Sequence, residues 1–451
     1  MITVMKFGGT SVGSASALRN LAEIVVRDDS LKAVVVSAMS GVTNSLIAWT
    51  NRPDRKEALI ESLRQKHTDA LSKLVKKDEL KGLEVKLKVR LGALRQVMER
   101  YEVPESRPAT RDTIASWGER LSSLAVATLL SSRGVDAIAL TSEEAGISAL
   151  GRFGNGAADL EITSANFERN VKPLIKEGKT PVITGYYGIS QSNMPITFGR
   201  GGSDYSGAVV AYALDAATLQ IWTDVDGFMT ADPRIVPEAR TIEEMDYSEA
   251  AELAYFGAKV LHPRTIEPAR RKGIEVLVKN TFNPEHPGTK IHILTSRSGK
   301  MLKSVAVKPD LSIVKLYSAE IAYSPGLVTE LLDSIDREGT TAYAISTSLS
   351  TLALAVPKSD VKGVCDRIER LKSGQVERVV VREDVALVCA VGDDIINVKG
   401  VAARVFQAAE EADANIEMIS EGASDVALNF VVPGEKAVDV VKRLHERFIG
   451  G

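Results

Sequence analysis

The sequence predicts an α/β protein with a doubly wound, mainly parallel sheet, followed by two small βαββαβ units. Up to about residue 290, short apolar runs rich in β-branched residues alternate with helical patterns. This alternation is typical of a parallel sheet covered by helices on both faces. Beyond residue 290 the alternation gives way to a repeat with a constant offset of 74 residues. Such a repeat indicates two copies of one supersecondary unit.

The elements of the first region follow from the positions of the apolar runs. We expect strands at residues 3–7, 33–38, 135–140, 180–186, 217–224 and 274–279, with helices between them such as 14–26 and 167–176. Residues 53–102 interrupt the pattern with charged helices whose leucines recur every four residues, so we expect a helical excursion over about 53–110. We interpret His67, within it, as a helix-surface residue rather than a catalyst.

The repeat in the last third of the chain has the same order of elements in both copies. The first copy should contain a helix over 324–335 and strands at 342–346 and 352–356; the second, a helix over 400–409 and strands at 416–420 and 426–431. Gly326 matches Gly400 and Ile345 matches Ile419 at the same offset. The pattern therefore predicts two ferredoxin-like units.

Length and composition exclude several classes of protein. The 451 residues predict about three domains. With 56 Lys and Arg against 59 Asp and Glu, the net charge of −3 gives no reason to expect nucleic acid or a membrane as partner. Two cysteines without metal-type spacing fit a reducing compartment. No signal peptide or apolar run of membrane length is visible, so we expect a cytoplasmic protein.

The run TFGRGGSDY at residues 197–205 combines a glycine-rich turn with Arg200 and Asp204. It follows an apolar strand and precedes a helical pattern over 206–214. A helix entered through glycines points unpaired N–H groups and its positive dipole end at the ligand, which suits phosphate or carboxylate. Asp204 alone would be an ordinary first-turn acid, but three glycines around an arginine favour a binding turn.

The run KFGGTS at residues 6–11 predicts a second turn of this kind. Lys6 ends a strand and precedes Gly8 and Gly9, so we interpret it as a phosphate counter-ion rather than a solvated edge residue. The spacing is neither that of the phosphate loop GxxxxGK[ST] nor that of the dinucleotide motif GxGxxG. Both turns, and SAMSG at 37–41, follow strands, and ligands bind at the carboxyl ends of strands in such sheets.

These runs, together with WTDVDG at 222–227 and FGAKVLHP at 256–263, resemble the aspartate kinases of the amino-acid kinase superfamily. The C-terminal third resembles the paired ACT modules of the same enzymes. The resemblance implies an amino-acid kinase domain over 1–292, a first ACT domain over 311–380, and a second ACT domain built from 293–310 and 381–451. The first ACT domain would be inserted within the second, and residues 303–308 would complete the sheet of the second.

The reaction implied by the resemblance is the transfer of a phosphoryl group from ATP, with Mg²⁺, to the side-chain carboxylate of L-aspartate. Its product, 4-phospho-L-aspartate, is the first intermediate toward lysine, threonine and methionine. The attacking carboxylate is already ionised. Such a site therefore needs cations and N–H groups that offset the repulsion between two anions, rather than a proton acceptor.

We expect Lys6 to bridge the transferred phosphoryl group and the β-phosphate, and Arg200 to hold a carboxylate of aspartate. Asp204 should either hold Lys6 or organise the metal, whose ligands stay unknown. The family's motifs imply substrate contacts at Ser37, Thr43 and Glu119, the last binding the α-ammonium group, and a rim at Arg152, Phe153 and Gly154. They imply nucleotide contacts at Lys6, Gly8, Gly9, Thr223, Asp224, Met229, Arg234 and Lys259, with Met229 standing where many members have a tyrosine.

In this family, paired ACT domains bind an end-product amino acid at interfaces between chains, so we expect a homodimer or larger homo-oligomer. The corresponding residues here are Ser324, Pro325, Gly326, Leu327, Val328, Thr341, Ala342 and Tyr343. Lysine-sensitive members often carry an acid where this chain has Tyr343, which favours threonine over lysine as the effector. The alternative is that the repeat only builds an interface between subunits.

Two other functions stay open at this point. Another amino-acid kinase, acting on acetylglutamate, glutamate or carbamate, would share the fold, but Glu119, Thr43 and the ACT pair argue against it. A non-catalytic amino-acid sensor would be expected to lack Lys6, Arg200 or Asp204, and all three are present. No homoserine dehydrogenase domain is expected within the 451 residues.

Overall fold

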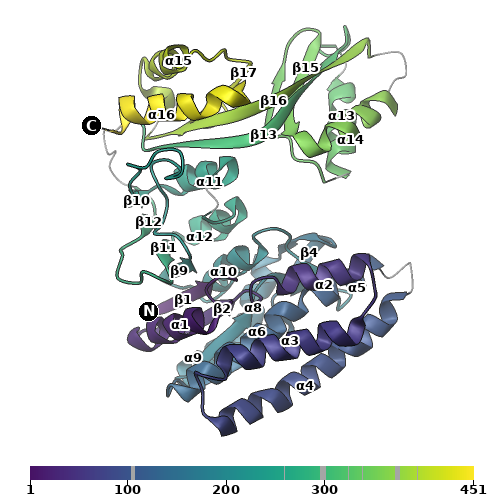
Figure 1. Cartoon of the computed structure of the whole chain (residues 1–451), viewed down its shortest axis with the longest axis vertical. Coiled ribbons are helices and arrows are strands. Elements are labelled where there is room, and N and C mark those ends of the chain that lie inside the picture. The colour runs from purple at the N-terminus through teal and green to yellow at the C-terminus, as the bar shows by residue number, and fades with distance from the viewer. Residues whose placement is uncertain are drawn as a thin grey trace. The chain divides into compact units, whose positions relative to one another are not determined.

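The computed structural model describes residues 1–102, 107–257, 260–294, 301–323, 325–337, 339–370, 376–393 and 395–450. The chain forms two compact units (Figure 1). The first comprises Met1–Phe228, Glu243–Tyr247 and Val260–Ile293, and the second comprises Met229–Ile242, Ser248–Lys259 and Leu294–Gly451. Two short segments that precede residue 292 thus belong with the C-terminal unit.

Within its described residues, the first unit contains an eight-stranded sheet in the order β10-β12-β11-β9-β1-β2-β6-β3. Its strands are β1 (Ile2–Phe7), β2 (Leu31–Val36), β3 (Ala137–Leu140), β6 (Thr180–Thr184), β9 (Thr218–Thr223), β10 (Glu244–Met245), β11 (Glu275–Asn280) and β12 (Thr289–Ile291). Neighbouring strands run parallel, except that β12 is antiparallel to β11. All six strands expected from the sequence of this region are confirmed, each within a few residues of its expected bounds.

Helices cover both faces of this sheet. Met5 and Phe7 of β1 point into the core formed with α1, α2, α3, α4 and α6. Because side chains alternate along a strand, Lys6 points to the opposite face, where Gly207 of α10 lies against its side chain. The helices are α1 (Ala15–Arg27), α2 (Val42–Asn51), α3 (Lys56–Leu71), α4 (Lys77–Glu99), α5 (Arg107–Ala115), α6 (Trp117–Ser132), α7 (Ser142–Ala145), α8 (Leu160–Asn170), α9 (Lys172–Lys176), α10 (Gly202–Ala213) and α12 (Ile266–Lys272). Two hairpins complete the unit: β4 (Ala149–Arg152) with β5 (Asn155–Ala158), and β7 (Tyr187–Ile189) with β8 (Pro195–Thr197).

One expected helix, 167–176, is wrong. The structure has two helices there, α8 and α9, which meet at Val171. Pro173 lacks the N–H that would continue the hydrogen-bond ladder to the carbonyl of Arg169, so a single helix through this point is disfavoured. The expected start of the helix at residue 206 is also late, because α10 already begins at Gly202 within the glycine-rich turn.

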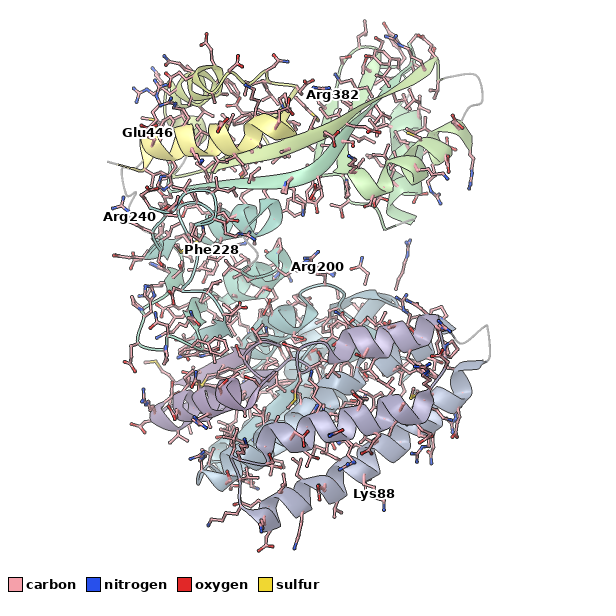
Figure 2. All side chains as sticks on the ribbon, in the orientation of Figure 1. Lys88, Arg200, Phe228, Arg240, Arg382 and Glu446 are labelled. Carbon is pink, nitrogen blue, oxygen red and sulfur yellow. The ribbon has the colours of Figure 1, made fainter. Side chains whose placement is uncertain are left out.

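The helical excursion is confirmed as α3 and α4, which pack side by side (Figure 1). Their leucines face the core, whereas Lys88 on α4 projects outward (Figure 2). The interpretation of His67 as a surface residue is wrong. His67 is fully buried, its Nδ1 lies 2.7 Å from the Leu63 carbonyl, and burial lowers the pKa of His67 to about 4. It shares the buried face of α3 with Leu63 and Leu71, and desolvation keeps the ring neutral.

The second unit contains, in its described residues, a six-stranded antiparallel sheet in the order β14-β15-β13-β16-β18-β17. Its elements are β13 (Ser304–Tyr317), α13 (Pro325–Arg337), β14 (Ala344–Thr347), β15 (Thr351–Pro357), α14 (Val361–Arg370), β16 (Arg378–Val391), α15 (Val401–Glu411), β17 (Met418–Ser420), β18 (Ala427–Pro433) and α16 (Ala437–Phe448). Helix α11 (Tyr247–Phe256) also belongs to this unit from residue 248 onward.

Two long strands join the repeated βαββαβ units into one sheet. The first part of β13, residues 304–308, pairs with 387–391 of β16, and its second part, 311–317, pairs with β15 and with 378–385 of β16. The expectation that residues 303–308 complete the sheet of the second βαββαβ repeat is therefore confirmed. Each of the two repeats has its own apolar core. The domain bounds given in the sequence analysis stay predictions.

A buried ion cluster lies within the second unit. Lys303 Nζ is 2.9 Å from Glu249 Oε1 and also forms an ion pair with Asp393. Burial alone would lower the pKa of Lys303, but hydrogen bonds to Asp393 and Glu249 raise it above its usual value. The cluster ties α11 to the start of β13. Within the described part of the chain, no helix is both long enough and apolar enough to cross a membrane.

Candidate active site

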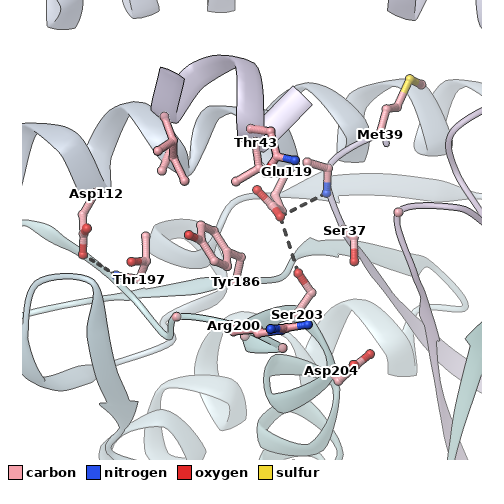
Figure 3. A pocket seen from close by; sticks show the side chains of 18 of the residues that line it. Ser37, Met39, Thr43, Asp112, Glu119, Tyr186, Thr197, Arg200, Ser203 and Asp204 are labelled. Carbon is pink, nitrogen blue, oxygen red and sulfur yellow. Dashed lines mark hydrogen bonds between the residues drawn. The ribbon is translucent and has the colours of Figure 1, made fainter. Parts of the chain in front are cut away.

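A polar pocket of about 610 Å³ opens at the carboxyl ends of the central strands of the first unit. It lies beside the residues that follow β1 and β2 and the turn that begins α10 (Figure 3). Its lining comprises Lys6, Gly9, Ser37, Ala38, Met39, Ser40, Gly41, Thr43, Asn44, Ile47, Arg111, Asp112, Ala115, Glu119, Gly154, Tyr186, Thr197, Gly199, Arg200, Gly201, Gly202, Ser203 and Asp204. The structure therefore brings Lys6, Ser37, Thr43, Glu119, Arg200 and Asp204 to one cavity, and their roles there stay predictions.

Lys6 and Asp204 form an ion pair, although 198 positions separate them in the sequence. Lys6 is only 5% exposed, because α10 lies directly on β1 at this point. A Cβ added at Gly207 would lie 3.0 Å from the Cβ of Lys6, so this close packing depends on a glycine in α10. The buried cation and its partner acid thus occupy fixed positions at one end of the pocket.

Positive backbone φ angles shape the turn that carries Arg200. Gly199 and Gly201 have φ angles of 72° and 70°, which glycine adopts without steric cost. A Cβ at Gly201 would lie 2.1 Å from the Cβ of His262, so no larger residue fits there. Arg200 is exposed at the pocket, and the structure records no partner for its guanidinium among the described residues. Figures 2 and 3 show its position.

The backbone amides of the two glycine turns are only partly free. The N–H of Gly8 donates to the Trp222 carbonyl at 3.0 Å, and the N–H of Gly202 donates to the Gly199 carbonyl at 3.0 Å. For the N–H of Gly9 no acceptor is recorded among the described residues. Gly9 is therefore the glycine amide in the first turn that is open to a ligand.

Glu119 lies in the first turn of α6 and is 2% exposed. Its Oε1 accepts hydrogen bonds from the Ala38 N–H at 3.0 Å and from the Ser203 hydroxyl at 3.4 Å (Figure 3). Its Oε2 is buried and has no partner in the described part of the chain. Burial raises the pKa of Glu119 to about 8, and these hydrogen bonds offset only part of that effect. A buried carboxylate oxygen without a donor suits a cationic ligand group.

Asp112 of α5 is a pocket residue that the sequence analysis missed. It is 4% exposed, and its Oδ2 accepts the N–H groups of Gly154 and Thr197, each at 2.7 Å. Burial raises the pKa of Asp112 above its usual value, although these bonds act in the opposite direction. No motif marks Asp112, because an acid in a charged helical region resembles a solvated one. The other lining residues that the sequence analysis did not assign include Ser40, Asn44, Ile47, Arg111 and Ala115.

Not all of the residues expected at the substrate rim and at the nucleotide line this pocket. Gly154 lines the pocket, whereas Arg152 and Phe153 do not. Thr223 is the last residue of β9, the neighbour of β1, and Asp224 follows it, but neither lines this pocket.

Met229 and Arg234, which are also expected to bind the nucleotide, belong to the second unit, where Arg234 forms an ion pair with Asp232. Lys259 lies outside the described residues. The nucleotide-binding roles of these residues and of Thr223 and Asp224 stay predictions.

Most of the expected effector residues are in the second unit, and Ser324 lies outside the described residues. Gly326 and Val328 are in the first turn of α13, whereas Leu327 is buried in the core of the first repeat. The N–H of Tyr343 donates to the Ala355 carbonyl at 2.8 Å. Its ring packs 5.4 Å from that of Tyr255, and the Nζ of Lys308 lies 4.9 Å from the same ring.

Comparisons with known proteins agree with this arrangement. The profile of the amino acid kinase family matches residues 1–280, and an ACT domain profile matches residues 388–448. The chain is 33% identical over 454 residues to lysine-sensitive aspartokinase 3 of Escherichia coli (strain K12), a match that covers 98% of both chains. It is 31% identical over 468 residues to the bifunctional aspartokinase/homoserine dehydrogenase of Daucus carota, and it spans 51% of that relative's length.

Solved structures show the same likeness over the whole chain. The structure of E. coli aspartokinase III in complex with aspartate and ADP (R-state) matches with a TM-score of 0.85 and 32% identity over 99% of both chains. The structure of the same enzyme in complex with lysine and aspartate (T-state) matches with a TM-score of 0.83 and 31% identity over 99% of both chains. By these matches the chain belongs to the aspartokinases of the amino acid kinase family.

Proposed function

We propose that this chain transfers the γ-phosphoryl group of ATP to the side-chain carboxylate of L-aspartate, giving ADP and 4-phospho-L-aspartate. The observation that carries the proposal is the pairing of two features in one pocket. A buried carboxylate oxygen, Oε2 of Glu119, has no donor among the described residues and suits an ammonium group, and two cations, Lys6 and Arg200, suit anions. An α-amino acid with an acidic side chain meets both requirements.

Lys6 reduces the repulsion between the two anionic reactants. Its ammonium group would contact the transferred phosphoryl group, where negative charge is spread over three oxygens as the bond to the leaving group breaks. Asp204 orients the Lys6 side chain through the ion pair, so the cation is in place before the reactants meet. The carboxylate of aspartate attacks without losing a proton, and no histidine lines the pocket among the described residues.

Glu119 and Arg200 would select the substrate. Arg200 can hold a carboxylate through paired N–H groups. Glu119 would bind the α-ammonium group at Oε2, which has no partner in the part of the chain that the structure describes. An N-acylated amino acid has no ammonium group and would leave this buried oxygen unpaired, so the pocket favours aspartate over acetylglutamate. Ser37 and Thr43 line the same pocket and are proposed to contribute polar contacts to the substrate.

Mg²⁺ would enter with ATP. Among the described residues, no group of three or more acidic, histidine or cysteine side chains lies close enough to hold a metal ion. This agrees with an ion held mainly by phosphate oxygens and water, as is usual for Mg²⁺ bound to nucleotides. Bound to the nucleotide, Mg²⁺ would neutralise negative charge on the phosphate groups. The residues of this chain that would touch it stay open, with Asp204 as the candidate.

We further propose that the ACT repeat binds an end-product amino acid and joins subunits into a homodimer or larger assembly. The effector could be lysine, which the E. coli relative binds, or threonine. Lys308 lies beside the ring of Tyr343. Tyr343 occupies the position where lysine-sensitive members often carry an acid. A cation next to this position opposes the ε-ammonium group of lysine and therefore favours threonine.

ATP-dependent formation of an acyl hydroxamate from aspartate tests the proposal. We expect product with aspartate and Mg²⁺, and none with N-acetyl-L-aspartate or without Mg²⁺. Titration with lysine, threonine and both together then tests the regulation, and light scattering tests the assembly. If aspartate yields no product at any Mg²⁺-ATP concentration, the proposed reaction is wrong. Activity that responds to neither amino acid would reject only the regulatory part.

A non-catalytic aspartate sensor is the second candidate. It would bind aspartate in calorimetry and still form no hydroxamate. Lys6 and Asp204 are paired in the structure and Arg200 lies at the same pocket, so the features that such a sensor would lose are in place.

A further inference from the structure

We propose that Asp112 is a positioning residue that fixes the turn carrying Arg200 and thereby sets the affinity of the site for aspartate. This inference rests on the proposed function. Asp112 comes from α5, at the end of the helical excursion, and it is far in sequence from the glycine-rich turn. Its carboxylate is nevertheless buried at the pocket wall, next to the residues that lead into that turn.

A single oxygen of Asp112 holds two separate segments. Oδ2 accepts the N–H of Thr197, the last residue of β8, and the N–H of Gly154, at the tip of the β4–β5 hairpin, both at 2.7 Å. Two residues after Thr197 comes Gly199, followed by Arg200. Hydrogen bonds to an ionised carboxylate are stronger than neutral ones, so Asp112 restrains both segments.

The two segments also touch each other. A Cβ at Gly199 would lie 3.0 Å from the Gly154 carbonyl oxygen, so the hairpin tip packs directly on the turn. Arg264, which is not among the pocket-lining residues, donates to the Asn155 side chain at 3.0 Å and to the Phe198 carbonyl oxygen at 3.4 Å. Asp112 therefore clamps the hairpin and the turn at the pocket, and Arg264 links the same two segments.

Without Asp112, the buried N–H of Thr197 and the part-buried N–H of Gly154 would lose their acceptor, and leaving a buried donor unpaired is costly. The turn would then relax away from its position, and Arg200 would no longer meet the substrate carboxylate in a fixed geometry. Because loss of orientation at a binding group weakens ligand capture, the effect should appear in the KM for aspartate. The Lys6–Asp204 pair has no hydrogen bond to Asp112, so ATP use should change little.

Three variants test the inference: Asp112→Ala, Asp112→Asn and the matched control Asp159→Ala. Asp159 follows the same hairpin and also accepts a backbone N–H, that of Ile162 at 3.0 Å, but it does not line the pocket. We expect Asp112→Ala to raise the aspartate KM at least about tenfold, since two charge-assisted hydrogen bonds are lost. The ATP KM should stay within about twofold. Asp112→Asn keeps an acceptor oxygen without the charge and should raise the aspartate KM only about two- to fourfold.

Hydrogen exchange supplies a readout that does not depend on activity. The amides of Thr197 and Gly154 should exchange faster in Asp112→Ala than in the wild-type protein and in Asp159→Ala. Equal aspartate KM values in Asp112→Ala and Asp159→Ala, or unchanged exchange at both amides, would overturn the inference. If Asp112→Ala does not fold, Asp112→Asn decides: a wild-type aspartate KM with wild-type exchange overturns it. A wild-type protein that leaves aspartate unphosphorylated would instead reject the proposed function, and exchange alone would then test the clamp.

Discussion

Replacement of Glu119 by glutamine should remove a pH dependence of aspartate binding that the wild-type structure predicts. Burial raises the pKa of Glu119 to about 8 in the ligand-free protein. At neutral pH this carboxyl group is therefore mostly protonated. A substrate ammonium group binds well only to the carboxylate form, so aspartate must displace the proton from Glu119 as it binds.

The size of the expected change in the aspartate KM with pH follows from the pKa of Glu119. With a pKa of about 8, roughly one protein molecule in ten carries the ionised form at pH 7, and about one in a hundred at pH 6. When only a fraction of the protein can bind, the apparent dissociation constant rises by the inverse of that fraction. We therefore expect the aspartate KM to rise about tenfold for each pH unit below 8, and to level off above it. In Glu119→Gln the KM should be high and nearly independent of pH.

To test this, the aspartate KM of the wild-type protein and of Glu119→Gln is measured between pH 6 and pH 8.5 at saturating Mg²⁺-ATP. Calorimetry of aspartate binding in two buffers with different ionisation enthalpies should also show about one proton released at pH 7. Glu143→Gln is a suitable control. Burial alone would raise the pKa of Glu143, but Arg120 lowers it below its usual value, so Glu143 stays ionised over this range. A flat wild-type profile, or equal slopes in wild type and Glu119→Gln, would refute the reasoning.

The same group affects folding stability, with a sign that follows from linkage. The pKa of Glu119 in the folded protein, about 8, exceeds the usual glutamate value of 4.5. Its contribution to stability is therefore complete below pH 4.5 and is lost as the pH rises through 8. The loss amounts to at most about 1.4 kcal/mol per pH unit. The free energy of unfolding of Glu119→Gln minus that of the wild-type protein should therefore be larger at pH 8 than at pH 5, as measured by denaturant unfolding without ligand.

Three further predictions concern other buried or pocket charges. Lys6→Ala should lower turnover at least about a thousandfold, because it removes the cation at the transferred phosphoryl group, while circular dichroism stays that of a folded protein; wild-type turnover would exclude Lys6 from that role. Arg200→Ala should mainly raise the aspartate KM and leave the ATP KM unchanged, and identical aspartate saturation curves would reject the carboxylate contact. Lys303→Met should lower the free energy of unfolding by about 3–5 kcal/mol, since it leaves Glu249 and Asp393 buried without their cation. Adding Glu249→Gln should recover part of that loss, and a single variant as stable as wild type would contradict the assignment of a buried ion cluster.

Much of the first unit could be predicted from local patterns. The strands, the helical excursion and the two glycine turns are encoded by neighbouring residues, because strand and helix periodicities and the φ angles of glycine are local properties. Lys6, Arg200 and Asp204 could be selected for the same reason, since each stands within a turn of recognisable composition. The parallel order of the strands then implied that these turns share one edge of the sheet.

Other features depended on contacts between distant segments. His67 was misinterpreted because the side of α3 that faces the core is decided by its packing against α4 and α6, which the spacing of leucines does not reveal for a polar residue. By contrast, the helix expected over 167–176 was wrong for a local reason, because the proline at position 173 disfavours a single helix there. The grouping of residues 229–242 and 248–259 with the second unit is likewise set by tertiary contacts.

The chemical groups of this protein and the turns on which they stand can be read from neighbouring residues, because those properties depend on residues close together in the chain. Which groups lose contact with water and with partners depends instead on how distant segments pack. The ion pair of Lys6 with Asp204 and the hydrogen bond of Asp112 with Thr197 join segments remote in sequence. Oε2 of Glu119 is buried without a partner among the described residues. Desolvation depends on everything packed around a group, so the charge state and binding preference of this site arise from the fold.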